Sequence, residues 1–207
     1  LLTELGIPWI QAPSEGEAQA AYLTTKGDAD YCGSQDYDSL LFGAKALVRN
    51  VTVSGRRKVP RQNRYIEVFP EVMKLDQALN ELEISREQLI DVAILVGTDF
   101  NPDGVKGVGP KTALKLIKKH GCIEEATSEI GEVNFAENLT AIREIFLKPK
   151  ITDDYNLKWN TPNVEGVVNF LCRERDFSED RVRRTLNKMT DGLKEAKSKT
   201  TLESWFG

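Results

Sequence analysis

Residues 14–42 read SEGEAQAAYLTTKGDADYCGSQDYDSLLF, and the elements that this stretch predicts indicate the fold class. Ser14 opens an alanine-rich segment that predicts a helix over Glu15–Thr25, and Asp28–Ser34 has the character of a buried strand. Asp36–Phe42 then predicts a loop followed by a short helix. Together with an apolar strand candidate at Gly6–Ile10, this strand–helix–strand order predicts an α/β fold with a partly parallel central sheet flanked by helices.

The rest of the chain adds a second half that is mainly helical. Further strands are expected at Lys45–Val53 and Arg64–Phe69, with the basic residues 54–64 as a loop or hairpin tip. The predicted helices are Pro70–Leu82, a helix running from the capping box Ser85–Gln88 through Leu95, Pro110–Lys119, Asn134–Leu147, Asn163–Arg175 and Ser178–Leu193. A structured loop is expected over Gly97–Gly109 and an irregular segment over Pro149–Trp159.

These elements predict one domain over residues 1–194. Its parts are an α/β portion (1–84), a helix–hairpin–helix DNA-binding element (85–120) and a helical C-terminal portion (121–194). Residues 195–207 are polar and lysine-rich, which predicts a flexible tail. Because the chain starts without Met, on what reads as the end of a helix, we expect a preceding part to be missing or to lie on another polypeptide.

Composition restricts the class of protein. The chain has 207 residues, of which 40% are hydrophobic and 29% charged, as in soluble globular proteins. No apolar run approaches the roughly 18 residues of a membrane span, so no membrane partner is expected. Three isolated cysteines favour a reducing, cytosolic setting. A single histidine, His120, excludes a His-rich zinc site and disfavours Ser–His catalysis.

The net charge of −4 disfavours a nucleic-acid partner by itself, but the basic residues are concentrated. They form three groups: residues 54–64; Lys106, Lys111, Lys115, Lys118 and Lys119; and Arg173, Arg175, Arg181, Arg183 and Arg184. An acidic total with local basic patches fits a protein that holds metal ions with carboxylates and phosphates with Lys and Arg. The alternative is that each patch is ordinary solvated surface.

Carboxylates gather in three short stretches, at Glu15 and Glu17, at Asp36 and Asp38, and at Asp99. Clustered carboxylates repel one another, so a site built from them normally binds a hard cation. A site made of oxygen ligands suits magnesium or manganese. Two such ions about 4 Å apart are a common arrangement for cleaving a phosphodiester. These five residues are therefore our candidate catalytic and metal-binding residues.

Each acidic stretch also has a purely structural alternative. Ser14 to Glu17 matches a capping box, Asp36 or Asp38 could be a helix N-cap, and Asp99 could be a turn residue. Against the last of these, Asp99 follows the end of a helix, where an acid opposes the helix dipole and needs a compensating cation.

The sharpest local signal is Gly104-Val-Lys-Gly-Val-Gly-Pro-Lys111, which lies between two apolar helices. Its glycines let the backbone approach a phosphate, and the exposed amides at the start of the next helix can receive it. This predicts sequence-independent binding of a DNA backbone. The same loop could hold a monovalent cation with its carbonyls, and the alternative is an ordinary interhelical turn. The candidate DNA-binding residues are Lys106, Gly107, Val108, Gly109, Lys111 and Thr112.

The C-terminus places Leu202, Trp205 and Phe206 at helical spacing in a polar segment. Exposed apolar anchors at i, i+3 and i+4 suit one helical turn inserted into a hydrophobic pocket of a partner. Alternatively, these residues fold back onto their own domain.

Taken together, these residues resemble the flap endonuclease family, the XPG/Rad2-like 5′-nucleases, and specifically its archaeal members. The resemblance covers essentially the whole chain but only about the later two thirds of the family's length. It implies a PIN-like 5′-nuclease fold whose metal ligands are a Glu-x-Glu pair, an Asp-x-Asp pair and the aspartate of a Gly-[Ser/Thr]-Asp motif. The matching residues here are Glu15, Glu17, Asp36, Asp38 and Asp99.

The resemblance extends to binding. It implies that Leu89–His120 is a helix–two-turn–helix element that grips duplex DNA and holds a potassium ion. It also implies that Leu202, Trp205 and Phe206 bind the sliding clamp PCNA, although Lys199 replaces the usual Gln. The family has two further metal-binding aspartates and a helical gateway in its N-terminal region. We therefore expect this polypeptide alone to cleave poorly or not at all.

The function implied is a structure-specific 5′ flap endonuclease and 5′–3′ exonuclease of DNA replication and repair. It would use two Mg²⁺ ions, with Mn²⁺ as a substitute, on branched or flapped double-stranded DNA in the cytoplasm. The competing function is a non-catalytic DNA-binding module tethered to the sliding clamp. The retained acids disfavour it, because a binder gains nothing from negative charges near a phosphate chain. An unrelated metal phosphatase would leave the glycine-rich hairpin unexplained.

Overall fold

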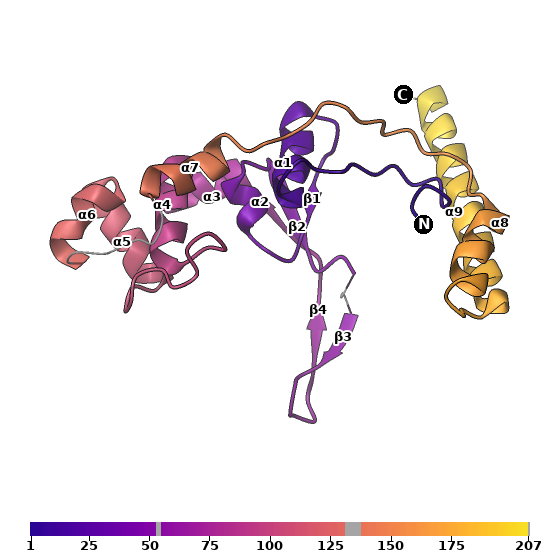
Figure 1. The fold of residues 1–207 in the computed structure, drawn as a ribbon, viewed down its shortest axis with the longest axis horizontal. Coiled ribbons are helices and arrows are strands. Elements are labelled where there is room, and N and C mark those ends of the chain that lie inside the picture. The colour runs from indigo at the N-terminus through magenta and orange to yellow at the C-terminus, as the bar shows by residue number, and fades with distance from the viewer. Residues whose placement is uncertain (53–54, 131–137, 207) are drawn as a thin grey trace. The chain divides into compact units, whose positions relative to one another are not determined.

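The computed structural model describes residues 1–52, 55–130 and 138–206, without the side chains of residues 57, 127, 128, 130 and 196–206. The chain divides into two compact units, each described by itself. Unit 1 joins Leu1–Gln11 to Asp153–Gly207, and unit 2 comprises Ala12–Thr152. Figure 1 shows the elements of both units.

A mixed three-stranded sheet organises unit 2. The order is β1 (Cys32–Gly33), β2 (Ala46–Arg49) and β5 (Glu71–Lys74). β1 runs parallel to β2, with Cys32 opposite Leu47, and β5 runs antiparallel to β2, with Leu47 opposite Met73. The short helix α2 (Asp38–Leu41) lies in the connection between β1 and β2. The predicted α/β class with a partly parallel sheet is confirmed.

Several predicted strands are wrong in detail. Only Cys32–Gly33 of the predicted strand Asp28–Ser34 pairs, and Gly6–Ile10 forms no strand. In the latter segment Pro8 has no N–H to donate, and the amide of Ile7 is bonded to Leu2 O in a local turn.

The hairpin expected after residue 53 is confirmed, and its predicted returning strand Arg64–Phe69 is β4 (Tyr65–Val68). The basic segment is not all loop, because its first residues form β3 (Gly55–Lys58), which pairs antiparallel with β4 in a hairpin that projects away from the sheet (Figure 1). The predicted helix Pro70–Leu82 begins as the strand β5, and the helix α3 covers only Leu75–Leu82. Pairing with the open edge of β2 overrides the helical pattern there.

Helices make up most of the rest of unit 2. They are α1 (Gly16–Lys26), α3, α4 (Arg86–Val96), α5 (Pro110–His120), α6 (Ile123–Ile130) and α7 (Leu139–Leu147). The capping box of α4 is confirmed, since Ser85 Oγ accepts from the amide of Gln88 and Gln88 Oε1 accepts from the amide of Ser85. Helix α6 was missed in the sequence, and residues 134–137 of the predicted helix Asn134–Leu147 lie outside the described residues.

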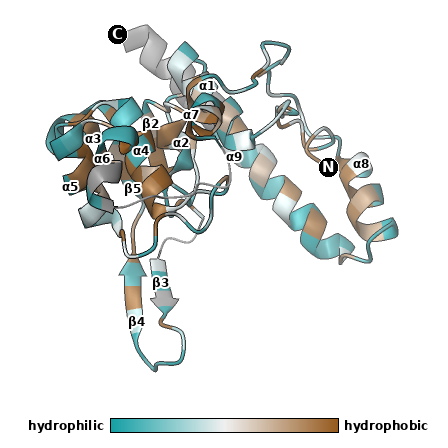
Figure 2. Cartoon of the chain, turned by 60° about the vertical axis from the view of Figure 1, so that its left-hand side comes forward, coloured by the Kyte–Doolittle hydropathy of each residue, from teal (hydrophilic) through white to brown (hydrophobic). Residues whose placement is uncertain are grey.

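The core of unit 2 lies between α1, α2, α4, α5 and α7. Ile90, Ile94 and Leu95 of α4 are fully buried, as are Ile117 of α5 and Phe146 of α7. Figure 2 shows hydrophobic stretches on α4 and α5, whereas the loop that joins β3 to β4 is mainly hydrophilic. This core fixes the ends of α2 and α4, where two of the candidate acids lie.

Unit 1 is helical. It contains α8 (Val164–Val168), the π-helical turn η1 (Asn169–Arg173) and α9 (Glu179–Phe206). Its core consists of Val167, Val168, Val182 and Leu186, against which Leu5 packs. Helix α9 continues through Phe206 where a tail was expected from residue 195, because no Gly or Pro interrupts residues 193–206. The side chains of Leu202, Trp205 and Phe206 lie outside the described residues. Within the described parts of both units, no helix is long and apolar enough to cross a membrane.

Candidate active site

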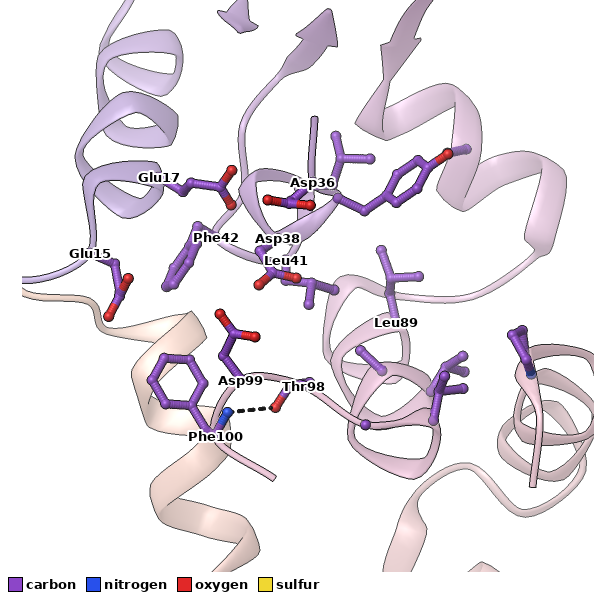
Figure 3. A pocket seen from close by; sticks show the side chains of 18 of the residues that line it. Glu15, Glu17, Asp36, Asp38, Leu41, Phe42, Leu89, Thr98, Asp99 and Phe100 are labelled. Carbon is purple, nitrogen blue, oxygen red and sulfur yellow. Dashed lines mark hydrogen bonds between the residues drawn. The ribbon is translucent and has the colours of Figure 1, made fainter. Parts of the chain in front are cut away.

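The candidate acids come from three elements that the fold of unit 2 brings together. Glu15 and Glu17 lie at the start of α1, Asp36 and Asp38 lie in the turn into α2, and Asp99 follows the end of α4. All five line one pocket of about 970 Å³ (Figure 3). In that view Glu17 and Asp36 point toward each other, Asp99 points toward Asp38, and Glu15 lies at the margin.

The capping alternatives for the first two stretches are wrong. Helix α1 has Glu15 as its N-cap and no side-chain cap bond, so Ser14 and Glu17 do not form a capping box. Glu17 instead accepts a hydrogen bond from Ser34 Oγ. The N-cap of α2 is Tyr37, again without a side-chain cap. The carboxylates of Glu17, Asp36 and Asp38 therefore do not cap the N-termini of α1 or α2.

A tight turn after α4 positions Asp99. Asn101 donates from Nδ2 to Ile94 O at 2.7 Å and accepts from Thr98 Oγ1 at 2.6 Å. The amide of Phe100 donates to Thr98 Oγ1 at 3.3 Å, the bond drawn in Figure 3. Asn101 and Thr98 are buried, so the turn is fixed from inside while Asp99 faces the pocket. Asp99 is thus a turn residue that also lines the acidic site.

The pocket concentrates negative charge. The pKa of Asp38 is raised by partial burial and then by the charges of Glu17, Asp99, Asp36 and Glu15. In the described part of the chain, none of these five acids forms an ion pair with a Lys, Arg or His side chain. Charges held together without a counterion are stabilised by a bound cation.

The donor set fits a hard divalent ion, because all five side chains offer carboxylate oxygens. Among the residues described, however, no three His, Cys, Asp or Glu side chains are arranged to hold a single metal ion. The pocket therefore has the right charge and ligand chemistry for magnesium or manganese but not a complete coordination shell. Ligands from elsewhere, or closure of the side chains around an ion, would be needed to complete it.

The pocket also has an apolar wall that the sequence did not indicate. Met73 of β5, Leu82 of α3 and Leu89, Val92 and Val96 of α4 line it beside the acids. Val96 is 37% exposed at this wall. The helical period of α4 predicts apolar residues that pack in a core. It does not predict that some of them line a pocket, because the pocket is formed together with α3 and β5.

The turn between α4 and α5 carries the candidate DNA-binding residues. Gly109 is the N-cap of α5 without a side-chain cap bond, and Pro110 occupies the first turn. Gly107 has φ +83°, a left-handed conformation that favours glycine. The side chains of Lys106, Lys111 and Thr112 are exposed, and Val108 is half-buried against the core. The turn thus presents backbone amides and lysines on one surface.

The lysine group of this region divides into paired and unpaired members. Lys118 pairs with Glu83 at 2.5 Å, and Lys119 pairs with Glu129. In the described residues, Lys106, Lys111 and Lys115 have no acidic partner within ion-pair distance. The charge available for a phosphate chain is therefore concentrated nearest the glycine-rich turn.

Comparison with known proteins places these features in context. The XPG I-region family model matches residues 6–99. Flap endonuclease 1 of Methanocella arvoryzae is 55% identical over the whole chain, and that of Thermococcus onnurineus is 54% identical. The chain spans 60% and 59% of the length of these two relatives, respectively.

Solved structures agree with this. The flap endonuclease-1 structure from Methanococcus jannaschii has a TM-score of 0.76 at 41% identity, over 92% of this chain and 55% of that one. The catalytic core of Rad2 in complex with a DNA substrate has a TM-score of 0.68 at 21% identity, over 89% of this chain and 65% of that one, and shows the shared fold.

Proposed function

The chain belongs to the flap endonuclease family, spanning about 60% of the length of its curated relatives, and on that premise we propose that it is part of a structure-specific 5′ flap endonuclease and 5′–3′ exonuclease acting on DNA. The observation that carries this proposal is the meeting of five acids from three separate segments around one pocket. A binding module would not concentrate unpaired carboxylates beside a phosphate chain, because like charges repel.

In this proposal Glu15, Glu17, Asp36, Asp38 and Asp99 hold divalent ions, Mg²⁺ or Mn²⁺ in its place. When bound, two such ions supply an activated water and stabilise negative charge at the scissile phosphate. The residues of the chain act as ligands and as the frame that holds those ligands. The buried turn at Asn101 fixes Asp99, and the core below α2 fixes Asp38.

DNA would be held at the α4–α5 turn. Amides near Gly107 and Gly109 and the amino groups of Lys106 and Lys111 suit backbone phosphates, so recognition would follow duplex shape and not base sequence. The carbonyls of the same turn are candidates for a potassium ion. We further propose that the helix end at Leu202, Trp205 and Phe206 binds the sliding clamp PCNA, and that the protein acts on branched or flapped DNA in the cytoplasm.

Paired variants of the intact nuclease, completed with the N-terminal part of the Methanocella relative, test the division of roles. Asp38→Ala should reduce cleavage by about 10²–10³-fold, the range for removing one electrostatic stabiliser of a transition state, while leaving DNA affinity nearly unchanged. Lys111→Ala should weaken DNA binding to a similar extent for all DNA sequences. It should also reduce the slope of log affinity against log salt concentration by about 1, because one phosphate contact is lost. Loss of DNA binding in Asp38→Ala as severe as its loss of cleavage would contradict the metal role.

A further inference from the structure

A single hydroxyl joins two of the acidic segments. Ser34 Oγ donates a hydrogen bond to Glu17 Oε1 and accepts one from the amide of Asp36 at 3.1 Å. Glu17 belongs to α1, whereas Asp36 belongs to the loop after β1, so the hydroxyl connects a helix to a loop. The amide of Ser34 also donates to Val48 O at 3.2 Å, which continues the pairing of β1 with β2. Ser34 therefore connects the paired strands β1 and β2 to the acidic site.

Arg49, the last residue of β2, holds the same loop from the other side. Its Nε donates to Gln35 O at 3.0 Å, and its Nη1 donates to the hydroxyl of Tyr37. The guanidinium also lies over the Tyr37 ring, 4.2 Å from the centroid. The loop backbone is thus bonded to β2 at Ser34 and Gln35, Arg49 holds the side chain of Tyr37, and Ser34 is the contact between this loop and Glu17.

We propose that Ser34 is a positioning residue that orients Glu17 and Asp36 toward a shared divalent ion; the inference rests on the proposed function of the acidic pocket. A hydroxyl has one proton to donate and lone pairs to accept. Its proton occupies Glu17 Oε1, which leaves Oε2 and the remaining lone pairs for a cation. Its lone pair receives the Asp36 amide, which sets the direction in which the Asp36 side chain leaves the loop. Outer partners of this kind typically change metal affinity by about 10–100-fold when removed.

The alternative is that Ser34 only stabilises the end of β1. The two roles differ in what they require of the side chain. Ser34 is half-buried and its side chain is small, so Ser34→Ala should leave the fold intact. Ser34→Thr keeps the hydroxyl, and it should therefore restore metal binding if the hydroxyl orients the carboxylates.

Titration of the nuclease, completed with the N-terminal part of the Methanocella relative, with Mn²⁺ and followed by calorimetry, tests the inference without an activity measurement. Ser34→Ala should weaken Mn²⁺ binding by about 10–100-fold, and Ser34→Thr should recover most of it. Ser14→Ala is the matched control, because it removes a serine hydroxyl close to Glu15 and Glu17 along the chain, at a helix start that uses no side-chain cap. Unchanged Mn²⁺ affinity in Ser34→Ala, or equal weakening in Ser34→Ala and Ser34→Thr, would overturn the inference.

A second measurement reports on the loop directly. In Ser34→Ala the Asp36 amide loses its acceptor, so its hydrogen exchange should become faster, whereas Ser14→Ala should leave it unchanged. Unaltered exchange at Asp36 would also contradict the inference. The completed nuclease and its Asp38→Ala variant separate this result from the proposed function: if both bind Mn²⁺ equally, or neither binds it, the metal site itself is refuted and the inference with it. If Asp38→Ala loses Mn²⁺ and Ser34→Ala does not, only the inference fails.

Discussion

At the scale of single residues, Arg143 determines how α7 is joined to α4 and α6. Asp91 is 3% exposed and accepts from Arg143 Nε at 2.6 Å and Nη2 at 2.9 Å. Asp91 Oδ2 also accepts from the amide of Ile123 at 3.1 Å, and Arg143 reaches outward to Glu124. The buried carboxylate is therefore satisfied by one cation and one backbone amide.

Removing this cation should be costly. Arg143→Ala leaves Asp91 buried and uncompensated, which should lower the free energy of unfolding by about 3–5 kcal/mol. Lys148→Ala at the C-cap of the same helix is the control, because its pair with Glu144 is exposed and should contribute less than about 1 kcal/mol. Urea denaturation of both variants would measure the difference, and a similar cost for the two would contradict the buried role of Arg143.

Arg143→Ala should also change how the free energy of unfolding depends on pH in acid. Hydrogen bonds from Arg143 lower the pKa of Glu124 to about 2. Because the folded pKa lies below the unfolded value, this contribution is present above about pH 4.5 and is lost as the pH falls toward 2. In Arg143→Ala the loss of stability over this interval should be smaller, and unchanged pH dependence would exclude the pairing as its cause.

At the scale of elements, an aromatic cluster connects the acid-bearing segments. Phe146 of α7 is fully buried, with its ring centroid 5.0 Å from Phe42 and 5.5 Å from Phe100. Phe42 ends α2, which begins with Asp38, and Phe100 directly follows Asp99. Helix α7 carries no candidate acid, yet it holds the segments that do.

Truncation of this ring should affect both stability and the site. Phe146→Ala should destabilise unit 2 by about 3–5 kcal/mol and weaken Mn²⁺ binding, because Phe42 and Phe100 lose their common support. Phe146→Leu keeps much of the apolar volume and should cost less on both measures. Thermal denaturation and metal titration would report the two effects, and full Mn²⁺ affinity in a folded Phe146→Ala would show that α7 does not support the site.

At the scale of the whole molecule, the pocket of unit 2 combines an acidic half with an apolar wall at Leu89, Val92 and Val96. The curated relatives are longer than this chain, which covers about 60% of them. Among the described residues, no complete coordination shell is formed.

This arrangement predicts a clear activity difference. Residues 1–207 alone should show no detectable Mg²⁺-dependent cleavage of a flapped duplex, because the described residues form no complete coordination shell for the ions. Supplying the N-terminal part of the Methanocella relative, as a fused chain, should restore cleavage. A gel assay with labelled flap DNA would measure both, with Asp38→Ala in the fused chain as the control for contamination. Cleavage by the unfused chain would show this prediction wrong.

The patterns that could be recognised from sequence were those formed by local chemistry. The capping box at Ser85, the start of α5 at Pro110 and the glycine-rich turn at Gly107 depend on neighbouring residues only, and each lies where the sequence predicts it. Strand lengths were less predictable. Residues 71–74 have an apolar pattern compatible with a helix, but they form a strand because they pair with the free edge of β2.

Local sequence was enough for the capping box of α4, for the start of α5 at Pro110 and for the motif spacing that marks the family. Three features of the site depend on tertiary packing. Glu17, Asp38 and Asp99 line one pocket, and Glu17 accepts a hydrogen bond from Ser34 instead of capping its own helix. Arg49 holds the loop after β1 through the carbonyl of Gln35. Helix caps and turns follow from contacts a few residues apart, whereas a shared pocket depends on packing between segments whose acids lie 21 to 82 positions apart along the chain.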